Sequence, residues 1–198
     1  MGKTINDFEE KLKNLQEEFV AFKNARRKVP EIGGTVDIAG MEWIILDKTD
    51  DGYLAITKGF ENLSKNFDSD SNNWKSSDLR NYLNTKFLEK IEEDIGVGIL
   101  PKFERDLTSL DGQTEYGTCM DKISLLTVDE YRKYRKYLPN TNEWWWLCTP
   151  WSTPCNGYEK TVTVVSPSGI FFNSRFGCGD GVRPFCIFPS SIFESEEE

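Results

Sequence analysis

The chain has 198 residues, of which 38% are hydrophobic and 29% charged, a balance typical of a soluble globular domain. Its apolar runs fall far short of the roughly 20 residues that a membrane helix needs, and its first ten residues lack the apolar stretch of a secretory signal peptide. We therefore expect a protein that is made in a bacterial cytoplasm and has no membrane partner.

Residue usage restricts the chemistry further. There is no histidine, which excludes Ser-His and Cys-His nucleophile pairs and any His-ligated metal site. The five cysteines form no C-x-x-C pair, and this favours reduced, mostly buried thiols over a zinc site or a disulfide framework. We expect a protein that is not an enzyme and that has no metal and no cofactor.

The charge is distributed unevenly. Residues 29–198 contain 17 basic and 28 acidic residues, a net charge of −11, against −9 for the whole chain. Because binding to phosphate depends on Lys and Arg, this acidic body disfavours direct contact with nucleic acid. It leaves a cationic protein partner possible.

The first 30 residues are predicted to form an amphipathic helix that ends before Pro30. Apolar side chains recur at alternating steps of three and four, which is the a/d pattern of a coiled coil. This seam either packs on the domain of the same chain or mediates self-association, and its three phenylalanines favour a homotrimer. The predicted oligomerisation residues are Ile5, Phe8, Leu12, Leu15, Phe19 and Phe22.

Residues 31–190 are predicted to form the main domain. Strands 41–47 and 53–57 flank the turn residues Asp50 to Gly52, which predicts a hairpin. A helix is expected after the N-cap cluster at Ser76 and Ser77. The segment 96–122 has no sustained period and is predicted to be mostly loop.

The next elements have clear boundary signals. A short strand is expected at 123–126, and a second helix begins at the capping box of Thr127 and Glu130. Further along, strands 161–165 and 170–173 flank a Ser-Pro-Ser-Gly turn, which predicts a second hairpin. A final strand is predicted at 182–188, at a sheet edge or with a bulge because of Pro184. Residues 191–198 are predicted to form an acidic tail.

Five segments, in this order, resemble a family of bacterial and phage domains of unassigned function. That family typically shows W-x-V-L-D, N-W-x-x-S-x-L-R, D-K-V-F-L-L-S, W-W-L-R-S-P and G-V-R-P motifs. The corresponding segments here are WIILDK (43–48), NNWKSSDLRNYL (72–83), DKISLLT (121–127), WWWLCTP (144–150) and DGVRPF (180–185).

The resemblance implies an α+β fold of the C-type-lectin-like kind, distantly similar to formylglycine-generating enzymes: short antiparallel strands, two helices and long loops. In such relatives the loops mostly bind ligands. This chain has Cys148 where the family has arginine and Trp151 where it has glycine, so Arg183 is expected to have different surroundings. The helix of residues 1–30 lies outside the resemblance.

Two loops, 149–160 and 173–180, contain the predicted ligand-binding residues. Both flank strands of the second hairpin, so we expect them on the same side of the sheet. Trp151, Tyr158, Arg175 and Phe176 should be at least partly exposed, whereas Trp43, Trp74 and two of Trp144 to Trp146 should be buried. Aromatic rings interleaved with Asn, Arg and Asp are typical of surfaces that recognise a protein or a carbohydrate, although glycine-rich scaffold loops are the alternative. The predicted residues are Trp151, Asn156, Tyr158, Asn173, Arg175, Phe176 and Asp180.

Two other sequence patterns could indicate a calcium site or a pair of reactive thiols. Asp68, Asp70 and Asn72 match the opening of a calcium loop, but Leu79 stands where the bidentate glutamate belongs, so a helix-entry turn explains the segment better. Cys178 and Cys186 are the only pair that suggests the thiol chemistry of formylglycine-generating enzymes, and the second lies in a predicted strand.

Together these features predict a non-catalytic recognition module encoded by a phage or a mobile element, binding a protein or glycan through loops of its C-terminal third. The main alternative is an acidic intracellular inhibitor that docks on a basic nucleic-acid-binding host protein, such as a defence nuclease. A structural virion component is the third possibility. The sequence leaves the final location, virion or host cytoplasm, undecided.

Overall fold

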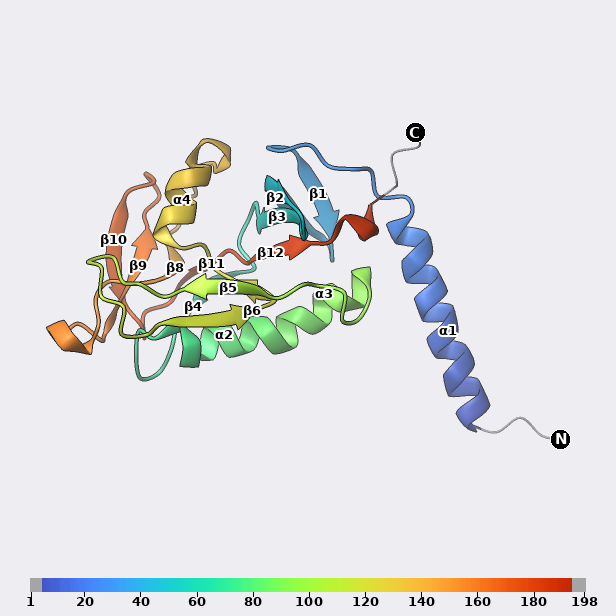
Figure 1. Ribbon diagram of the computed structural model, residues 1–198, viewed down its shortest axis with the longest axis horizontal. Helices are drawn as coiled ribbons and strands as arrows, with labels where there is room; N and C mark the ends of the chain where they lie inside the picture. Colours follow the sequence, from blue (N-terminus) through green and yellow to red (C-terminus); the bar gives the residue numbers. More distant parts are fainter. Residues whose placement is uncertain (1–4, 194–198) are drawn as a thin grey trace.

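A computed structural model describes residues 5–193, and it confirms an α+β protein with an N-terminal helix. The body contains two five-stranded sheets and a separate two-stranded hairpin, with helices on both sides of the sheets (Figure 1). The helices are α1 Ile5–Asn24, α2 Asp78–Tyr82, α3 Leu88–Ile95 and α4 Val128–Tyr134. The strands are β1 Thr35–Ile38, β2 Met41–Thr49, β3 Gly52–Thr57, β4 Asn62–Lys65, β5 Phe103–Asp106, β6 Thr118–Asp121, β7 Ile123–Ser124, β8 Trp145–Pro150, β9 Thr161–Val165, β10 Phe171–Arg175, β11 Asp180–Val182 and β12 Phe185–Phe188.

The central strands are buried on both faces. The first sheet has the order β1-β2-β3-β12-β7 and the second has the order β10-β9-β8-β11-β4. Within β8, Trp146 belongs to one core cluster and Trp145 to the other, because successive side chains point to opposite faces. Strands of this kind need apolar residues at consecutive positions, which explains the adjacent tryptophans Trp145 and Trp146.

The helices cover these two faces. α2 and α3 are joined by a π-helical turn, Leu83–Phe87, and they pack on the face that includes Trp43 and Trp146. α4 packs on the opposite face (Figure 1). Ser77 accepts a hydrogen bond from the Arg80 amide as the N-cap of α2, and Thr127 with Glu130 forms the capping box of α4. Both helix starts were predicted and are confirmed.

α1 projects away from the body, which it contacts only at its C-terminal end (Figure 1). Asp94 of α3 forms ion pairs with Lys23 and Arg27 and accepts a hydrogen bond from the Ala39 amide at 2.9 Å. The Asn24 side chain donates to the Ile95 carbonyl at 2.8 Å. The direction of α1 is therefore fixed by polar contacts, and no residue of α1 is buried.

Segment 96–122 is mostly loop, as predicted, but it also contains a hairpin that was not predicted, because β5 and β6 pair in register from Phe103 with Asp121 to Asp106 with Thr118. Two other predictions need correction. The predicted strand 182–188 is divided into β11 and β12, which belong to different sheets, and β12 lies between β3 and β7 rather than at an edge. The buried core also continues past residue 190, to Ile192 and Phe193.

Two buried arginines stabilise the body in different ways. Arg105 is 2% exposed and donates to both carboxylate oxygens of Glu130, at 2.7 and 2.6 Å. Arg183 is fully buried, donates twice to the Thr57 carbonyl at 2.8 and 3.0 Å, and lies over the ring of Trp145. Burial lowers the pKa of Arg183 to about 10. Within residues 5–193, Arg183 forms no ion pair, so the backbone carbonyl and the ring replace a carboxylate.

Across residues 5–193, the structure contains no helix that is both long enough and apolar enough to cross a bilayer. Most of the predicted acidic tail, residues 194–198, lies outside the described residues.

Candidate functional site

The two predicted binding loops meet at one end of the second sheet. β9 and β10 pair antiparallel, with Thr161 opposite Arg175, so the segment before β9 and the segment after β10 leave the sheet together. Trp151 at the end of β8 donates its amide hydrogen to the Thr161 carbonyl at 3.1 Å. The Phe176 amide donates to the Lys160 carbonyl, also at 3.1 Å. We call the surface formed by residues 151–160 and 175–180 the recognition surface.

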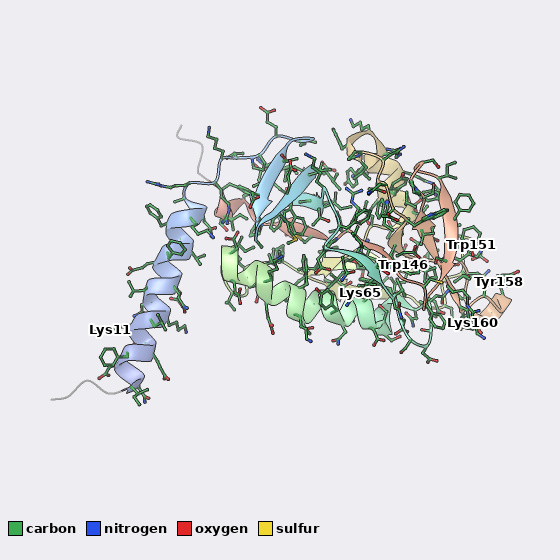
Figure 2. All side chains as sticks on the ribbon, turned by 180° about the vertical axis from the view of Figure 1, so that it is seen from behind. Lys11, Lys65, Trp146, Trp151, Tyr158 and Lys160 are labelled. Atoms are coloured by element: carbon green, nitrogen blue, oxygen red, sulfur yellow. The ribbon has the colours of Figure 1, made fainter. Side chains whose placement is uncertain are left out.

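The predicted distribution of aromatic side chains is confirmed. Tyr158 is 55% exposed and Trp151 is half-buried, and Figure 2 shows both, with Lys160, at the end of the molecule opposite to α1. Arg175 is exposed as well. Trp43 and Trp74 are fully buried, and of the three consecutive tryptophans only Trp144 reaches the surface.

The other predicted binding residues differ in their exposure and in the elements to which they belong. Asn156 is exposed, and its amide donates to Asp111 at 2.9 Å. Asn173 is exposed within β10, which runs to Arg175, so both are strand residues rather than loop residues. Phe176 packs partly into the main core cluster, which makes it more a support than a contact residue. Asp180 is half-buried at the start of β11, where burial raises the pKa of its carboxyl.

A fully buried asparagine holds the first loop in place. The Asn72 side-chain amide donates to the carbonyls of Ser152, Tyr158 and Thr161, at 2.8, 3.1 and 2.7 Å. Its side-chain oxygen accepts a hydrogen bond from the Tyr116 hydroxyl at 2.7 Å. One side chain therefore fixes both ends of the loop that presents Tyr158. From the sequence, Asn72 belongs to a family motif and to a turn that resembles the opening of a calcium loop, and neither predicts these contacts with the loop.

A segment outside the predicted binding residues lies against the same loop. Asp111, between β5 and β6, accepts hydrogen bonds from Ser152 at 2.6 Å and Asn156 at 2.9 Å. Hydrogen bonds from Ser109, Ser152 and Asn156 hold the pKa of Asp111 below its usual range, so this group is a carboxylate at neutral pH. The polar, turn-forming composition of residues 106–117 was the available signal for this role.

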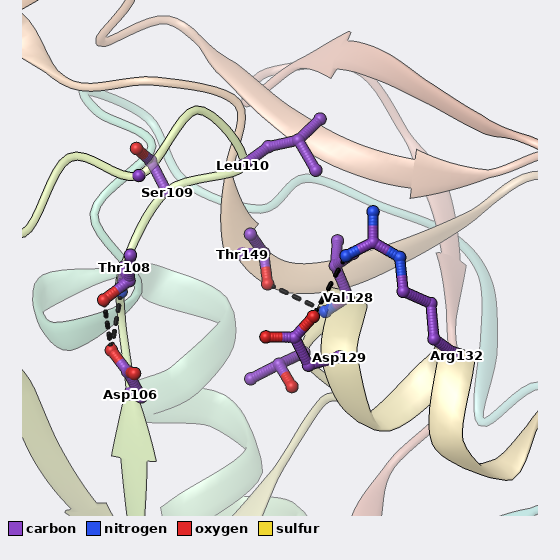
Figure 3. Close-up of a pocket in the computed structure, with 10 residues that line it drawn as sticks. Asp106, Thr108, Ser109, Leu110, Val128, Asp129, Arg132 and Thr149 are labelled. Carbon is purple, nitrogen blue, oxygen red and sulfur yellow. Dashed lines mark hydrogen bonds and ion pairs between the residues drawn. The ribbon is translucent and has the colours of Figure 1, made fainter.

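A polar pocket of about 290 Å³ adjoins this segment (Figure 3). Its charged side chains already have partners: Asp106 accepts two hydrogen bonds from Thr108, and Arg132 pairs with Asp129 at 3.0 Å. The Thr149 hydroxyl accepts a hydrogen bond from the Val128 amide at 3.0 Å. The pocket is lined by Asp106, Thr108, Ser109, Leu110, Gly112, Thr127, Val128, Asp129, Arg132 and Thr149.

The cysteines and carboxylates near the loops are the remaining candidates for reactive groups or metal ligands. All five cysteines are free thiols, with Cys155 and Cys178 exposed. A hydrogen bond from its thiol to Glu115, at 3.1 Å, raises the pKa of Cys155, which is the opposite of what activates a nucleophile. Asp68 accepts from the amides of Ser71 and Asp78, so it shapes the entry to α2. Among residues 5–193 no group of three or more potential ligands is arranged to hold a metal ion.

Comparison with known proteins gives only partial similarity. No family model matches the chain, and no solved structure matches it. It is 26% identical over 98 residues to peptide chain release factor 1 of Orientia tsutsugamushi (strain Ikeda), covering 50% of this chain and 27% of that protein. It is 25% identical over 135 residues to peptide chain release factor 1 of Ehrlichia ruminantium (strain Gardel), covering 65% of this chain and 37% of that protein. The chain thus spans about a third of the length of these relatives or less.

Proposed function

We propose that the protein is a non-catalytic recognition module that binds a protein or a glycan through the recognition surface. The observation that carries the proposal is that Tyr158 is exposed and Trp151 partly exposed on a loop whose backbone is fixed by hydrogen bonds from Asn72, with Arg175 exposed at the adjoining end of β10. Rigid aromatic side chains beside a cation are preferred anchors in binding sites. A preorganised loop also loses less conformational entropy when it binds.

The finer fold assignment belongs to the same proposal. Short, mostly antiparallel strands, helices beside the sheets and long connecting segments support a C-type-lectin-like fold, as the five ordered motifs imply. In this fold the loops contact the ligand, which agrees with the position of the recognition surface. The encoding of the protein by a phage or a mobile element also rests on this resemblance.

A second candidate function is supported by the charge of the body. Asp111 and Glu115 lie beside the first loop, and residues 29–198 have a net charge of −11. An inhibitor of a basic nucleic-acid-binding protein needs carboxylates at its contact surface. Such a partner would bind through the carboxylates, and its affinity would fall steeply with salt.

Hydrogen–deuterium exchange tests the position of the binding surface. The ligand is first captured on a glycan array or by pull-down, and exchange is then compared with and without it. We expect slower amide exchange in residues 151–160 and 175–180, because a bound ligand excludes water and restricts opening of these loops. Protection confined to the segment 106–117 would favour the inhibitor, and protection elsewhere would contradict both candidates.

A further inference from the structure

The apolar seam of α1 is exposed along its whole length. Its six side chains are between 54% and 77% exposed, and they recur at the a and d positions of nearly three heptads. α1 contacts the body through a different stripe, in which Lys23, Asn24 and Arg27 bond to α3 and Val20 lies within reach of Gly96. The attachment of α1 to the body therefore leaves the seam free.

We propose that the seam packs against the seam of a second copy, with the two α1 helices antiparallel. In this arrangement Leu12 lies opposite Leu15, Phe8 opposite Phe19, and Ile5 opposite Phe22. Each layer combines an a position with a d position, so Phe22 faces an isoleucine instead of a second Phe22. A parallel pair would place all three phenylalanines against their own copies, whereas the antiparallel pair keeps only the contacts between Phe8 and Phe19.

The charges beside the seam agree with the antiparallel direction. Lys11 and Glu18 occupy the g positions, which face each other in an antiparallel pair, so each interface would contain two Lys11–Glu18 pairs. In the described part of the chain neither residue forms an ion pair. In a parallel pair Glu18 would instead face Lys23, which is already ion-paired with Asp94, and Lys11 would face the uncharged Gln16.

The position of the body also favours antiparallel helices. It is attached at the C-terminal end of α1, and a helix of 20 residues is roughly 30 Å long. Antiparallel helices place the two bodies at opposite ends, whereas parallel helices crowd them at one end. A hollow of about 460 Å³ at the base of α1, lined by Phe19, Phe22, Arg26 and Asp37 among others, adjoins the place that Ile5 of the second copy would occupy.

The dimer would hold two recognition surfaces far apart and facing away from each other, because each lies at the end of its body opposite to α1 (Figure 2). Two such surfaces on one particle bind a repetitive partner more tightly than either surface alone. The homotrimer expected from the sequence would instead place all bodies at one end. The dimer does not depend on the identity of the ligand.

Sedimentation equilibrium of the full chain tests the proposal. The parent is expected to be a dimer and Leu12→Asp a monomer with the melting temperature of the body unchanged, because an unpaired charge cannot remain in a packed seam. Asn14→Asp, on the same helix but outside the seam, is the control and stays a dimer. A monomeric or trimeric parent overturns the proposal.

Charge variants test the direction of the helices. Lys11→Glu and Glu18→Lys should each weaken association roughly tenfold, while an equimolar mixture of the two regains parental affinity because each glutamate then faces a lysine. Lys13→Glu makes the same charge change outside the seam and should not weaken association. If Lys11→Glu associates like the parent, the antiparallel arrangement is wrong.

Discussion

Replacing Glu130 with alanine is expected to lower the free energy of unfolding by about 3–5 kcal/mol, because the change leaves Arg105 buried without a counter-charge. The Arg105 side chain is 2% exposed, and its Nε atom has no hydrogen-bond partner in the described part of the chain. Its remaining contacts, to the Leu125 carbonyl at 2.9 Å and to the Cys148 sulfur at 3.5 Å, involve no carboxylate. Urea denaturation at neutral pH measures the loss.

The same pair gives the fold a dependence on pH. Burial alone would raise the pKa of Glu130, but the Arg105 guanidinium holds it below its usual range. A carboxyl with a lowered pKa stabilises the fold above the pKa of the unfolded state, and this contribution disappears as the pH falls through the folded-state pKa. The difference between parent and Glu130→Ala should therefore shrink in acid.

The matched control is Asp129→Ala, the adjacent position on α4. Asp129 forms an exposed ion pair with Arg132, with side chains 90% and 58% exposed, so its loss should cost less than about 1 kcal/mol. Equal losses for the two variants would show that the buried pair has no special role.

Replacing Asn72 with alanine is the second change with a large expected effect, about 3 kcal/mol. It removes three hydrogen bonds to the loop carbonyls and leaves the Tyr116 hydroxyl without its acceptor, and each buried group that loses its partner costs about 1–3 kcal/mol. In the variant, water can reach some of these carbonyls. The total loss of stability is therefore smaller than the sum of the individual costs. Denaturation measures the loss, and faster amide exchange in residues 152–161 locates it.

Asn73→Ala serves as the control for this change. The Asn73 side chain accepts one local hydrogen bond, from the Lys75 amide at 3.0 Å, as the cap of a short 3₁₀ turn. Its loss should cost about 1 kcal/mol and leave exchange in residues 152–161 unchanged. If Asn72→Ala exchanges like the parent in this loop, the loop is held by other contacts.

Much of the fold could be predicted from the sequence where local signals decide the structure. Ser77, the capping box at Thr127 and the Ser166 to Gly169 turn each fix their element through contacts within a few residues. Gly169 has φ +82°, and a side chain there would collide with Arg135 and Tyr131. The capping and turn signals act within one turn of the chain, whereas the collision at Gly169 involves side chains of and after α4.

The missed elements depend on distant contacts. The only buried residue of β5 is Arg105, so its pattern gives no apolar signal for a strand, and its partner β6 follows a long loop. At the end of the chain, Pro184 lies in the link between β11 and β12, where the Pro184 carbonyl accepts from the Thr57 amide. A proline there removes no ladder hydrogen bond, which is why it is compatible with a central strand.

The same distinction between local signals and distant contacts applies to the candidate site. Its anchors, the half-buried Trp151 and the exposed Tyr158 and Arg175, could be selected from composition and from the hairpin that brings their segments together. The residues that hold the loops could not, because Asn72 lies about 80 residues before the loop it fixes and Asp111 lies in a segment predicted to be mostly loop, with no predicted role. A single sequence contains no direct signal for hydrogen bonds of this separation.

The most direct test of the recognition surface is a comparison of ligand affinity and melting temperature for Trp151→Ala and Arg175→Ala. The control is Trp144→Ala, a tryptophan 38% exposed that precedes the other end of β8. If the surface binds the ligand, both variants keep the parental melting temperature and lose about 30-fold or more in affinity, while Trp144→Ala binds like the parent. Parental affinity in Trp151→Ala and Arg175→Ala, or early melting of both, would contradict the account.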